Sequence, residues 1–305
     1  MLKPSPFAAI DRERWRELGG GGSPLAYDEL AGLSGLGEPV AVDEMTDVYL
    51  PLARLLTLRI EAARALSIDQ GAFLGEPPHA VPFLLALGGS VAVGKSTAAR
   101  LVVRLLASLR PNWRVELVTT DGFLLPNAAL IERGILARKG FPESYDRRRL
   151  LRFVADLKSG VQEVRAPVYS HLHYDVVPGE AQVVRAPHVV VLEGVNVLQR
   201  GSGRVYVSDF VDFALYLDAE EDDVRRWYVE RFLTLRNGAF QNPDSYFHRY
   251  AGLSDAEAVA VATGIWERTN RPNLLTNIQP TRPRADLILE KGPDHFVSRV
   301  LLRRT

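Results

Sequence analysis

The sequence predicts an α/β fold in which helices cover both faces of a mostly parallel β-sheet, with a helical extension at the N-terminus. Apolar runs of strand length alternate with segments of helical spacing, and several runs are unbroken Val, Leu and Ile, which is typical of strands buried on both faces. No Pro/Ser/Gly-rich linker follows Gly22. We therefore expect an extension over residues 1–80 packed on a main unit over 81–305, together one continuous structural domain.

The elements are expected in the following order. A short first helix ends at a flexible turn in the glycine run from Gly19 to Ser23. Residues 43–67 have helical spacing, with a break near Pro51. The strands expected after that are 83–88, 115–120, 188–194, 212–218 and 285–290. The helices expected between them are 96–109, 147–158, 220–236 and 254–269.

Composition and charge limit the class of protein. The 305 residues carry 37 Lys and Arg against 37 Asp and Glu, so the chain as a whole is not drawn to nucleic acid or to an anionic membrane, and any anion site must be local. The absence of cysteine excludes disulfides and thiolate metal sites. The first residues lack the apolar core of a signal peptide, and no apolar run approaches the ~20 residues of a membrane span. These features predict a cytoplasmic protein without nucleic-acid or membrane partners.

A glycine-rich stretch stands between the first predicted strand of the sheet and a predicted helix. It fits the pattern G-x-x-x-x-G-K-[ST] of a phosphate-binding P-loop, in which the backbone amides and the helix N-terminus surround phosphate oxygens. Lys95 can reach the β- and γ-phosphates of ATP, and the Ser96 hydroxyl can ligate Mg²⁺. The alternative is a structural turn. The predicted ATP-binding residues are Gly89, Ser90, Val91, Ala92, Val93, Gly94, Lys95, Ser96 and Thr97.

Two acidic residues end predicted strands. Asp121 follows VELVTT, and Glu193 follows HVVVL. Ligands of open α/β sheets lie at the carboxyl ends of the strands, so both acids should meet Lys95 in one crevice, as phosphoryl transfer requires. Because Asp-Gly and Glu-Gly also occur in turns, the alternative for each acid is a turn or capping residue.

Two further segments are rich in polar aromatic residues. The stretch APVYSHLHYD contains His171 between regular elements, although a single histidine is more often structural. The stretch RWYVERFLTLR places Tyr228, Arg231 and Leu235 near one helical face. The alternative for this second segment is a salt-bridged helix that covers the core.

Together these segments resemble the type I (bacterial) pantothenate kinases, members of the P-loop kinase superfamily. The matches run in order from about Pro82 to Arg304, and YLPLARLL extends them toward the N-terminus. The matching stretches include GGSVAVGKST, VELVTTDGF, KGFPESYD, APVYSHLHYDVVP, LEGVNVLQ, WYVERF, GAFQNPDSYFHRYA, TNRPNLLTNIQPTRPRADLIL and DHFVSRVLLRR.

The resemblance implies a reaction and a set of site residues. The family transfers the γ-phosphoryl group of ATP, with Mg²⁺, to the 4′-hydroxyl of pantothenate, is inhibited by coenzyme A and forms homodimers. The implied catalytic residues are Asp121, Lys95 and Arg231, and Mg²⁺ would be held by Ser96 and, through water, by Glu193. The implied pantothenate contacts are Asp121, Tyr169, His171, Tyr228, Arg231 and Asn270. The implied coenzyme A contacts are Lys95, Arg100, His171 and Phe232, and His295 would frame the adenine.

One position departs from the family pattern. Leu235 stands where an aromatic residue is expected in the apolar pocket near the pantothenate tail, which affects inhibitor fit rather than the reaction. A uridine kinase-like or phosphoribulokinase-like enzyme is the first alternative, against which DSYFHRYA and TNRPNLLTNIQPTR favour a pantothenate kinase. A nucleotide-dependent regulatory switch is the second alternative, although the chain lacks the guanine motif N-K-x-D.

Overall fold

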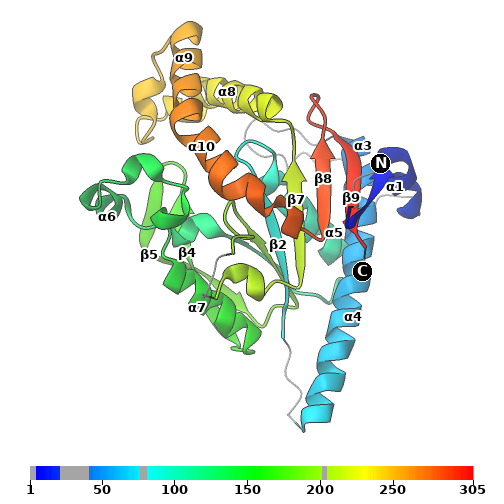
Figure 1. Cartoon of the computed structure of the whole chain (residues 1–305). Helices are drawn as coiled ribbons and strands as arrows, with labels where there is room; N and C mark the ends of the chain where they lie inside the picture. Colours follow the sequence, from blue (N-terminus) through cyan, green and yellow to red (C-terminus); the bar gives the residue numbers. More distant parts are fainter. Residues whose placement is uncertain (1–4, 21–40, 76–80, 201–204, 305) are drawn as a thin grey trace.

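The computed structural model describes residues 5–20, 41–75, 81–200 and 205–304, and it confirms the predicted α/β fold (Figure 1). A seven-stranded sheet has the order β1-β9-β8-β7-β2-β6-β3, and a separate pair is formed by β4 and β5. The strands are β1 Phe7–Asp11, β2 Phe83–Gly89, β3 Val115–Thr119, β4 Glu163–Ser170, β5 Asp175–Arg185, β6 Val189–Glu193, β7 Phe213–Asp218, β8 Leu287–Lys291 and β9 Val297–Arg303.

The helices alternate with the strands in the central part of the chain. The α-helices are α1 Arg12–Leu18, α3 Val42–Glu44, α4 Leu50–Leu74, α5 Lys95–Leu109, α6 Asn127–Glu132, α7 Arg147–Lys158, α8 Glu221–Asn237, α9 Asp255–Ile265 and α10 Arg271–Asn273. Short 3₁₀ and π segments join several of them. No helix in the described ranges is both long and apolar enough to cross a membrane.

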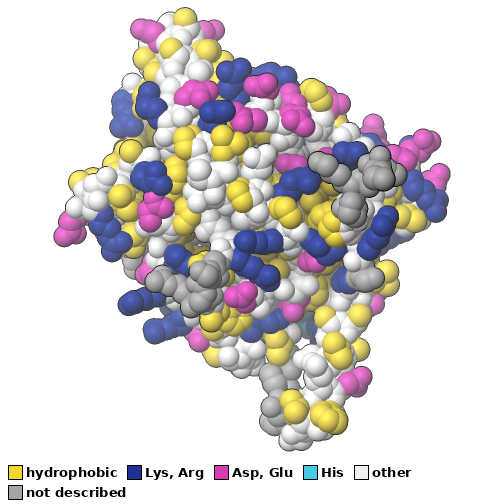
Figure 2. Space-filling model, in the orientation of Figure 1, with side chains coloured by type: hydrophobic (Ala, Val, Ile, Leu, Met, Phe, Trp, Pro, Cys, Tyr) yellow, Lys and Arg dark blue, Asp and Glu magenta, His cyan; other side chains and the backbone are white. Residues whose placement is uncertain are grey.

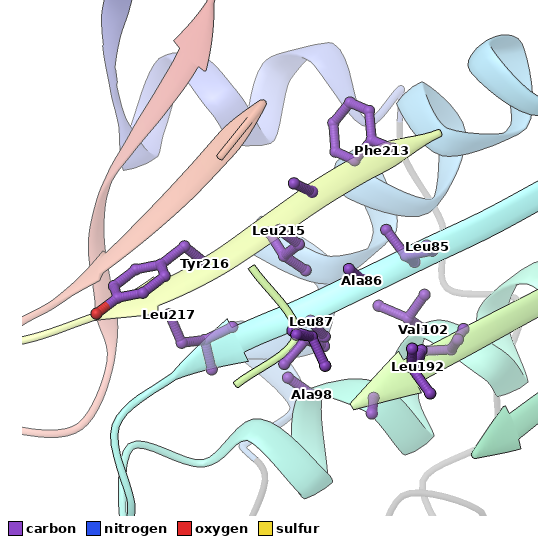
Figure 3. Packing of buried hydrophobic residues seen from close by; sticks show 14 of the residues in the cluster. Leu85, Ala86, Leu87, Ala98, Val102, Leu192, Phe213, Leu215, Tyr216 and Leu217 are labelled. Carbon is purple, nitrogen blue, oxygen red and sulfur yellow. The ribbon is translucent and has the colours of Figure 1, made fainter. Parts of the chain in front are cut away.

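Strands β3, β6, β2, β7 and β8 run parallel, whereas β9 is antiparallel to both β8 and β1. Every residue of β2 and β6 is buried, as expected for apolar strands covered on both faces. Figure 3 shows Leu85 and Leu87 of β2 among Val102 of α5 and Leu215 of β7, all parts of one core. This core fixes the strand ends from which the site is built.

Helices cover both faces of the sheet. In Figure 1, α4 and α5 lie behind it, while the segment around α10 crosses in front. Helices α8 and α9 project beyond the carboxyl ends of the strands, and β4 and β5 lie to one side. Basic and acidic side chains are interspersed on the face in Figure 2, as expected for equal numbers of each.

Some elements differ from expectation. Strands β1 and β9 and the β4–β5 pair were not predicted, and α4 continues to Leu74 instead of ending at residue 67. The break expected near Pro51 is a change from a π-helix over Met45–Tyr49 to an α-helix, which Pro51 joins in its first turn, where its missing N–H costs no hydrogen bond. The helix expected over 254–269 becomes a π-helix at Trp266–Asn270. The expected turn at Gly19 to Ser23 lies largely outside the described residues.

Candidate active site

The P-loop curls between β2 and α5 because its residues adopt left-handed backbone angles. Gly89, Ala92 and Gly94 have φ of 139°, 58° and 89°. A Cβ on Gly89 would lie 2.5 Å from the Leu217 carbonyl oxygen, so only glycine fits where the loop leaves the sheet. The helix that follows turns its unpaired amides toward the loop, which forms a site for phosphate.

Lys95, Ser96 and Glu193 lie together at this loop. The Lys95 ammonium donates to the Ser90 carbonyl at 2.6 Å and is 4.0 Å from Glu193 Oε1. The Ser96 hydroxyl donates to Glu193 Oε2 at 3.2 Å. Burial raises the pKa of Glu193, and the nearby Lys95 charge acts against that rise. Glu193 is therefore a buried acceptor oriented toward the cation and hydroxyl of the loop.

The side-chain oxygens of Ser96 and Glu193 suit a Mg²⁺ ion that arrives bound to a nucleotide. No cluster of three or more His, Cys, Asp or Glu residues able to hold a metal occurs in the ranges that the structure describes. Mg²⁺ keeps several water and phosphate ligands and needs only one or two from protein. Ser96 and Glu193, joined by their hydrogen bond, offer that pair of oxygens.

Two glycines allow the strand ends carrying Asp121 and Glu193 to approach their neighbours. A Cβ on Gly122 would lie 1.9 Å from the Pro167 carbonyl oxygen of β4, and one on Gly194 would lie 1.8 Å from Thr120 Oγ1. The Asp-Gly and Glu-Gly pairs thus allow close packing at the strand ends that carry the two acids. The Tyr145 hydroxyl donates to Asp121 Oδ1 at 3.4 Å.

Lys139 is a functional candidate that the sequence reasoning missed. Its ammonium donates to Asn127 Oδ1 at 2.6 Å and lies 4.1 Å from the centre of the Tyr174 ring. Burial lowers the pKa of Lys139 to about 8, while the negative charges of Asp175 and Asp121 act in the opposite direction. KGFPESYD, which contains it, was noticed only as part of the resemblance, because nothing local shows that its lysine reaches Asp121.

Aromatic rings form a cluster near Asp121. Tyr169 meets His171 edge-on at 5.2 Å between ring centres and Tyr174 at 6.4 Å. Tyr174 in turn stacks on Tyr246 at 4.9 Å. Burial raises the pKa of Tyr169 and Tyr174, so both phenols stay protonated and available as donors near neutral pH. The sequence indicated Tyr169 and His171 but not Tyr174 or Tyr246.

Helix α8 supplies a polar edge and an apolar face. Tyr228 hydrogen-bonds Asn270 from the π-helical segment, and the charge of Arg231 acts on the same phenol. Phe232 is buried in a small cluster with Phe240, and Leu235 packs against that cluster. The α8 helix therefore brings Tyr228 and Asn270 together while Phe232 and Leu235 hold the helix against α9.

The C-terminal strands reach the other side of the P-loop. His295 stacks on Trp227 at 3.6 Å between ring centres, and burial and the cations of Lys291 and Arg226 lower its pKa to about 4. Lys291 Nζ donates to the Val93 carbonyl at 3.2 Å and lies 3.4 Å from His295 Nδ1. Lys291, which the sequence did not indicate, thus connects the loop to the neutral His295. One turn into α5, Arg100 donates to Thr97 Oγ1 at 3.4 Å.

Known proteins resemble this chain over half or more of its length. The Phosphoribulokinase / Uridine kinase family matches residues 84–237, about half of the chain. A pantothenate kinase of Myxococcus xanthus (strain DK1622) is 54% identical over 99% of this chain and 98% of its own length. One of Clavibacter michiganensis is 56% identical over 98% of this chain and 95% of its own.

The chain belongs to the pantothenate kinase family. Among solved structures, a putative fructose transport system kinase from Silicibacter sp. TM1040 has a TM-score of 0.53 and 25% identity, covering 73% of this chain and 94% of its own. A D-glycerate 3-kinase of Cryptococcus neoformans has a TM-score of 0.53 at 13% identity, over 81% and 97% of the two chains, which supports the P-loop kinase fold alone.

In this pantothenate kinase family member, contacts join several of the predicted site residues into three groups, whereas Phe232 is buried with Phe240 between α8 and α9. Lys95, Ser96 and Glu193 form the first, and His295 joins the loop from the far side through Lys291. Tyr169 and His171 form the second. Tyr228, Asn270 and Arg231 form the third. The contacts support these positions, and the individual roles stay predictions.

Proposed function

We propose that this chain phosphorylates pantothenate with ATP, the first step of coenzyme A biosynthesis. The supporting observation is that pantothenate kinases match nearly its whole length at 52–56% identity, whereas the Phosphoribulokinase / Uridine kinase match ends at residue 237. Asn270 and His295, two of the residues that we propose for the site, lie beyond residue 237, in the part of the chain that the Phosphoribulokinase / Uridine kinase match does not cover.

In the proposed reaction, the loop amides and Lys95 hold the β- and γ-phosphates and compensate the charge that develops on them. Ser96 and, through water, Glu193 would hold Mg²⁺, which would supply positive charge to neutralise part of the phosphate charge. Since Glu193 also faces Lys95, it keeps that ammonium directed into the loop. No covalent intermediate on the protein is needed.

Asp121 is the proposed base. The 4′-hydroxyl oxygen of pantothenate attacks the γ-phosphorus, the bond to the β–γ bridging oxygen breaks, and ADP departs with that electron pair. The hydroxyl proton passes to Asp121, whose carboxylate is held by Tyr145. Arg231 is the proposed cation for the transferring group. Because the protein supplies mostly position and charge, the rate depends on how firmly Asp121 is held.

Pantothenate offers hydroxyls, an amide and a carboxylate, and the aromatic cluster and helix α8 offer matching groups. We propose that Tyr169, His171, Tyr228 and Asn270 hydrogen-bond it. The Tyr228–Asn270 hydrogen bond supports this, because it orients both side chains without a ligand. The neutral His295, stacked on Trp227, is the proposed neighbour of the adenine.

Regulation, assembly and location are finer proposals. We propose inhibition by coenzyme A at Lys95, Arg100, His171 and Phe232, and a cytoplasmic location where ATP is available. A homodimer is supported by apolar residues that are exposed along α4, where Leu58 is 66% and Phe73 88% exposed. Light scattering tests the dimer, and a single-chain mass at micromolar concentration would exclude it.

A coupled assay of ADP release tests the function. Pantothenate, uridine and ribulose 5-phosphate are offered separately at equal ATP and Mg²⁺, with Asp121→Asn as the inactive control. We expect turnover with pantothenate alone and its loss in the control. Preference for uridine or ribulose 5-phosphate would contradict the proposal, and so would ATP binding without transfer to any acceptor.

A further inference from the structure

A cavity lies at the opposite end of the sheet from the P-loop. Its volume is about 360 Å³, within the range of small-molecule sites. Pro82, Arg114 and His188, which line it, stand directly before β2, β3 and β6. Because the seven residues of β2 extend roughly 23 Å, a ligand here would not touch nucleotide at the loop.

The cavity is cationic. Arg64 of α4, Arg114 and His188 line it, and among the lining residues within the described ranges there is no Asp or Glu. The carboxylates nearby already pair elsewhere, Glu61 with Arg110, Asp212 with Lys158, and Glu163 with Arg165 and Arg185. Within the described ranges neither Arg64 nor Arg114 has an ion-pair partner, so an anion entering the cavity would meet two unneutralised guanidinium groups.

Backbone contacts hold Arg114 and His188 in place. The Arg114 Nε donates to the Ala186 carbonyl at 2.8 Å, and Ala186 has a left-handed φ of 37°, a strained conformation for a residue with a Cβ. The Arg114 amide donates to His188 Nδ1 at 3.0 Å, so the neutral imidazole carries its proton on Nε2 and is a donor there. Burial, Arg64 and Arg114 together lower the pKa of His188.

The rest of the wall is apolar. Pro82, Leu157 and Pro187 are buried at its base, while Ile68 and Val161 leave 61% and 45% of their surface exposed at its rim. A ligand with an apolar body would cover these two side chains, which an inorganic ion would leave in water.

We propose that this cavity binds a small amphipathic anion, whose carboxylate or phosphate head pairs with Arg64 and Arg114 while its short apolar body covers Ile68 and Val161. The observations that carry this are two guanidinium groups that have no carboxylate partner among the described residues and line a cavity of ligand size, one of them held by the Ala186 carbonyl. The site is separate from the proposed kinase chemistry, and its test requires no catalysis.

Isothermal titration of the full chain with sodium octanoate, below the concentration at which it forms micelles, tests the proposal. We expect saturable binding at one site, unaffected by a non-hydrolysable ATP analogue. Arg64→Gln should weaken octanoate binding by about tenfold or more, because a charge-assisted contact is lost. Arg165→Gln is the matched control, since Arg165 is an exposed arginine that pairs with Glu163 and does not line the cavity.

Two further ligands test the charged head and the apolar body of octanoate separately. Octanol should bind much more weakly than octanoate, and inorganic phosphate should also bind more weakly because it lacks the apolar body. The His188 imidazole resonances should shift with octanoate and not with octanol. Absence of saturable octanoate binding, equal affinity in Arg64→Gln, or octanol or phosphate binding as tightly as octanoate would each overturn the proposal.

Discussion

Replacement of Gly122 by alanine should reduce turnover although it adds a single methyl group. The added Cβ would lie 1.9 Å from the Pro167 carbonyl oxygen, and it must move about 1.1 Å before the contact reaches 3.0 Å. Both partners are backbone, so the turn that carries Asp121 and the strand that carries Tyr169 have to separate. A displacement of about 1 Å at a reacting group costs on the order of 10²-fold in rate.

The assay compares kcat, the KM for each substrate and the free energy of unfolding in urea for Gly122→Ala and for Gly71→Ala. Gly71 lies within α4, and a Cβ there meets nothing within 4 Å. Gly71→Ala should keep full activity and gain about 0.4–1 kcal/mol of stability. Gly122→Ala should lose about 10²-fold in kcat and about 1–3 kcal/mol of stability from overpacking. Normal kcat in Gly122→Ala would show that this contact does not position Asp121.

Four other changes test single groups. Asp121→Asn should lower kcat by about 10²–10⁴-fold and leave ATP affinity, measured by titration calorimetry, unchanged; near-normal kcat would remove it from the base role. Tyr228→Phe should raise the KM for pantothenate several-fold and leave the KM for ATP alone, since one neutral hydrogen bond is worth about 0.5–1.5 kcal/mol. Arg100→Ala should weaken coenzyme A inhibition by about tenfold with little change in the KM for ATP, and equal inhibition would exclude Arg100 as a contact. Because the pKa of Lys139 falls to about 8 in the folded chain, keeping its buried ammonium group charged costs stability below that pH. The free energy of unfolding in urea should therefore rise for wild type relative to Lys139→Met between pH 8 and 10. A constant difference between the two would contradict this.

The predictable part of the site is the part that local backbone rules determine. The P-loop fixes its own conformation through glycine and the helix after it, and the carboxyl ends of parallel strands meet at one edge, so Lys95 and the two acids could be placed without a structure. Lys139 and Lys291 could not, because each reaches its partner through folding of distant segments. Lys291 contacts a carbonyl 198 positions away in the sequence.

Strand β1 illustrates the same limit for the fold. Its five residues, FAAID, have no alternation long enough to indicate a strand, and the segment is extended because it pairs antiparallel with β9 near the other end of the chain. The β4–β5 pair was missed for a related reason. Pro167 and Gly179 disfavour a strand locally, yet the two segments pair with each other outside the main sheet.

The N-terminal segment is linked to the P-loop through Glu44 and Lys291. Glu44, 7% exposed, accepts the amide of Val297 at 3.0 Å and an Arg12 guanidinium N–H at 2.5 Å. Burial raises the pKa of Glu44, while that amide, Arg12 and the charge of Lys291 act to lower it. Lys291 in turn holds the Val93 carbonyl of the P-loop. Loss of the Glu44 carboxylate would remove the acceptor of the buried Val297 amide and a negative charge that acts on Lys291, so we expect it to lower stability and to weaken the support of the P-loop by Lys291.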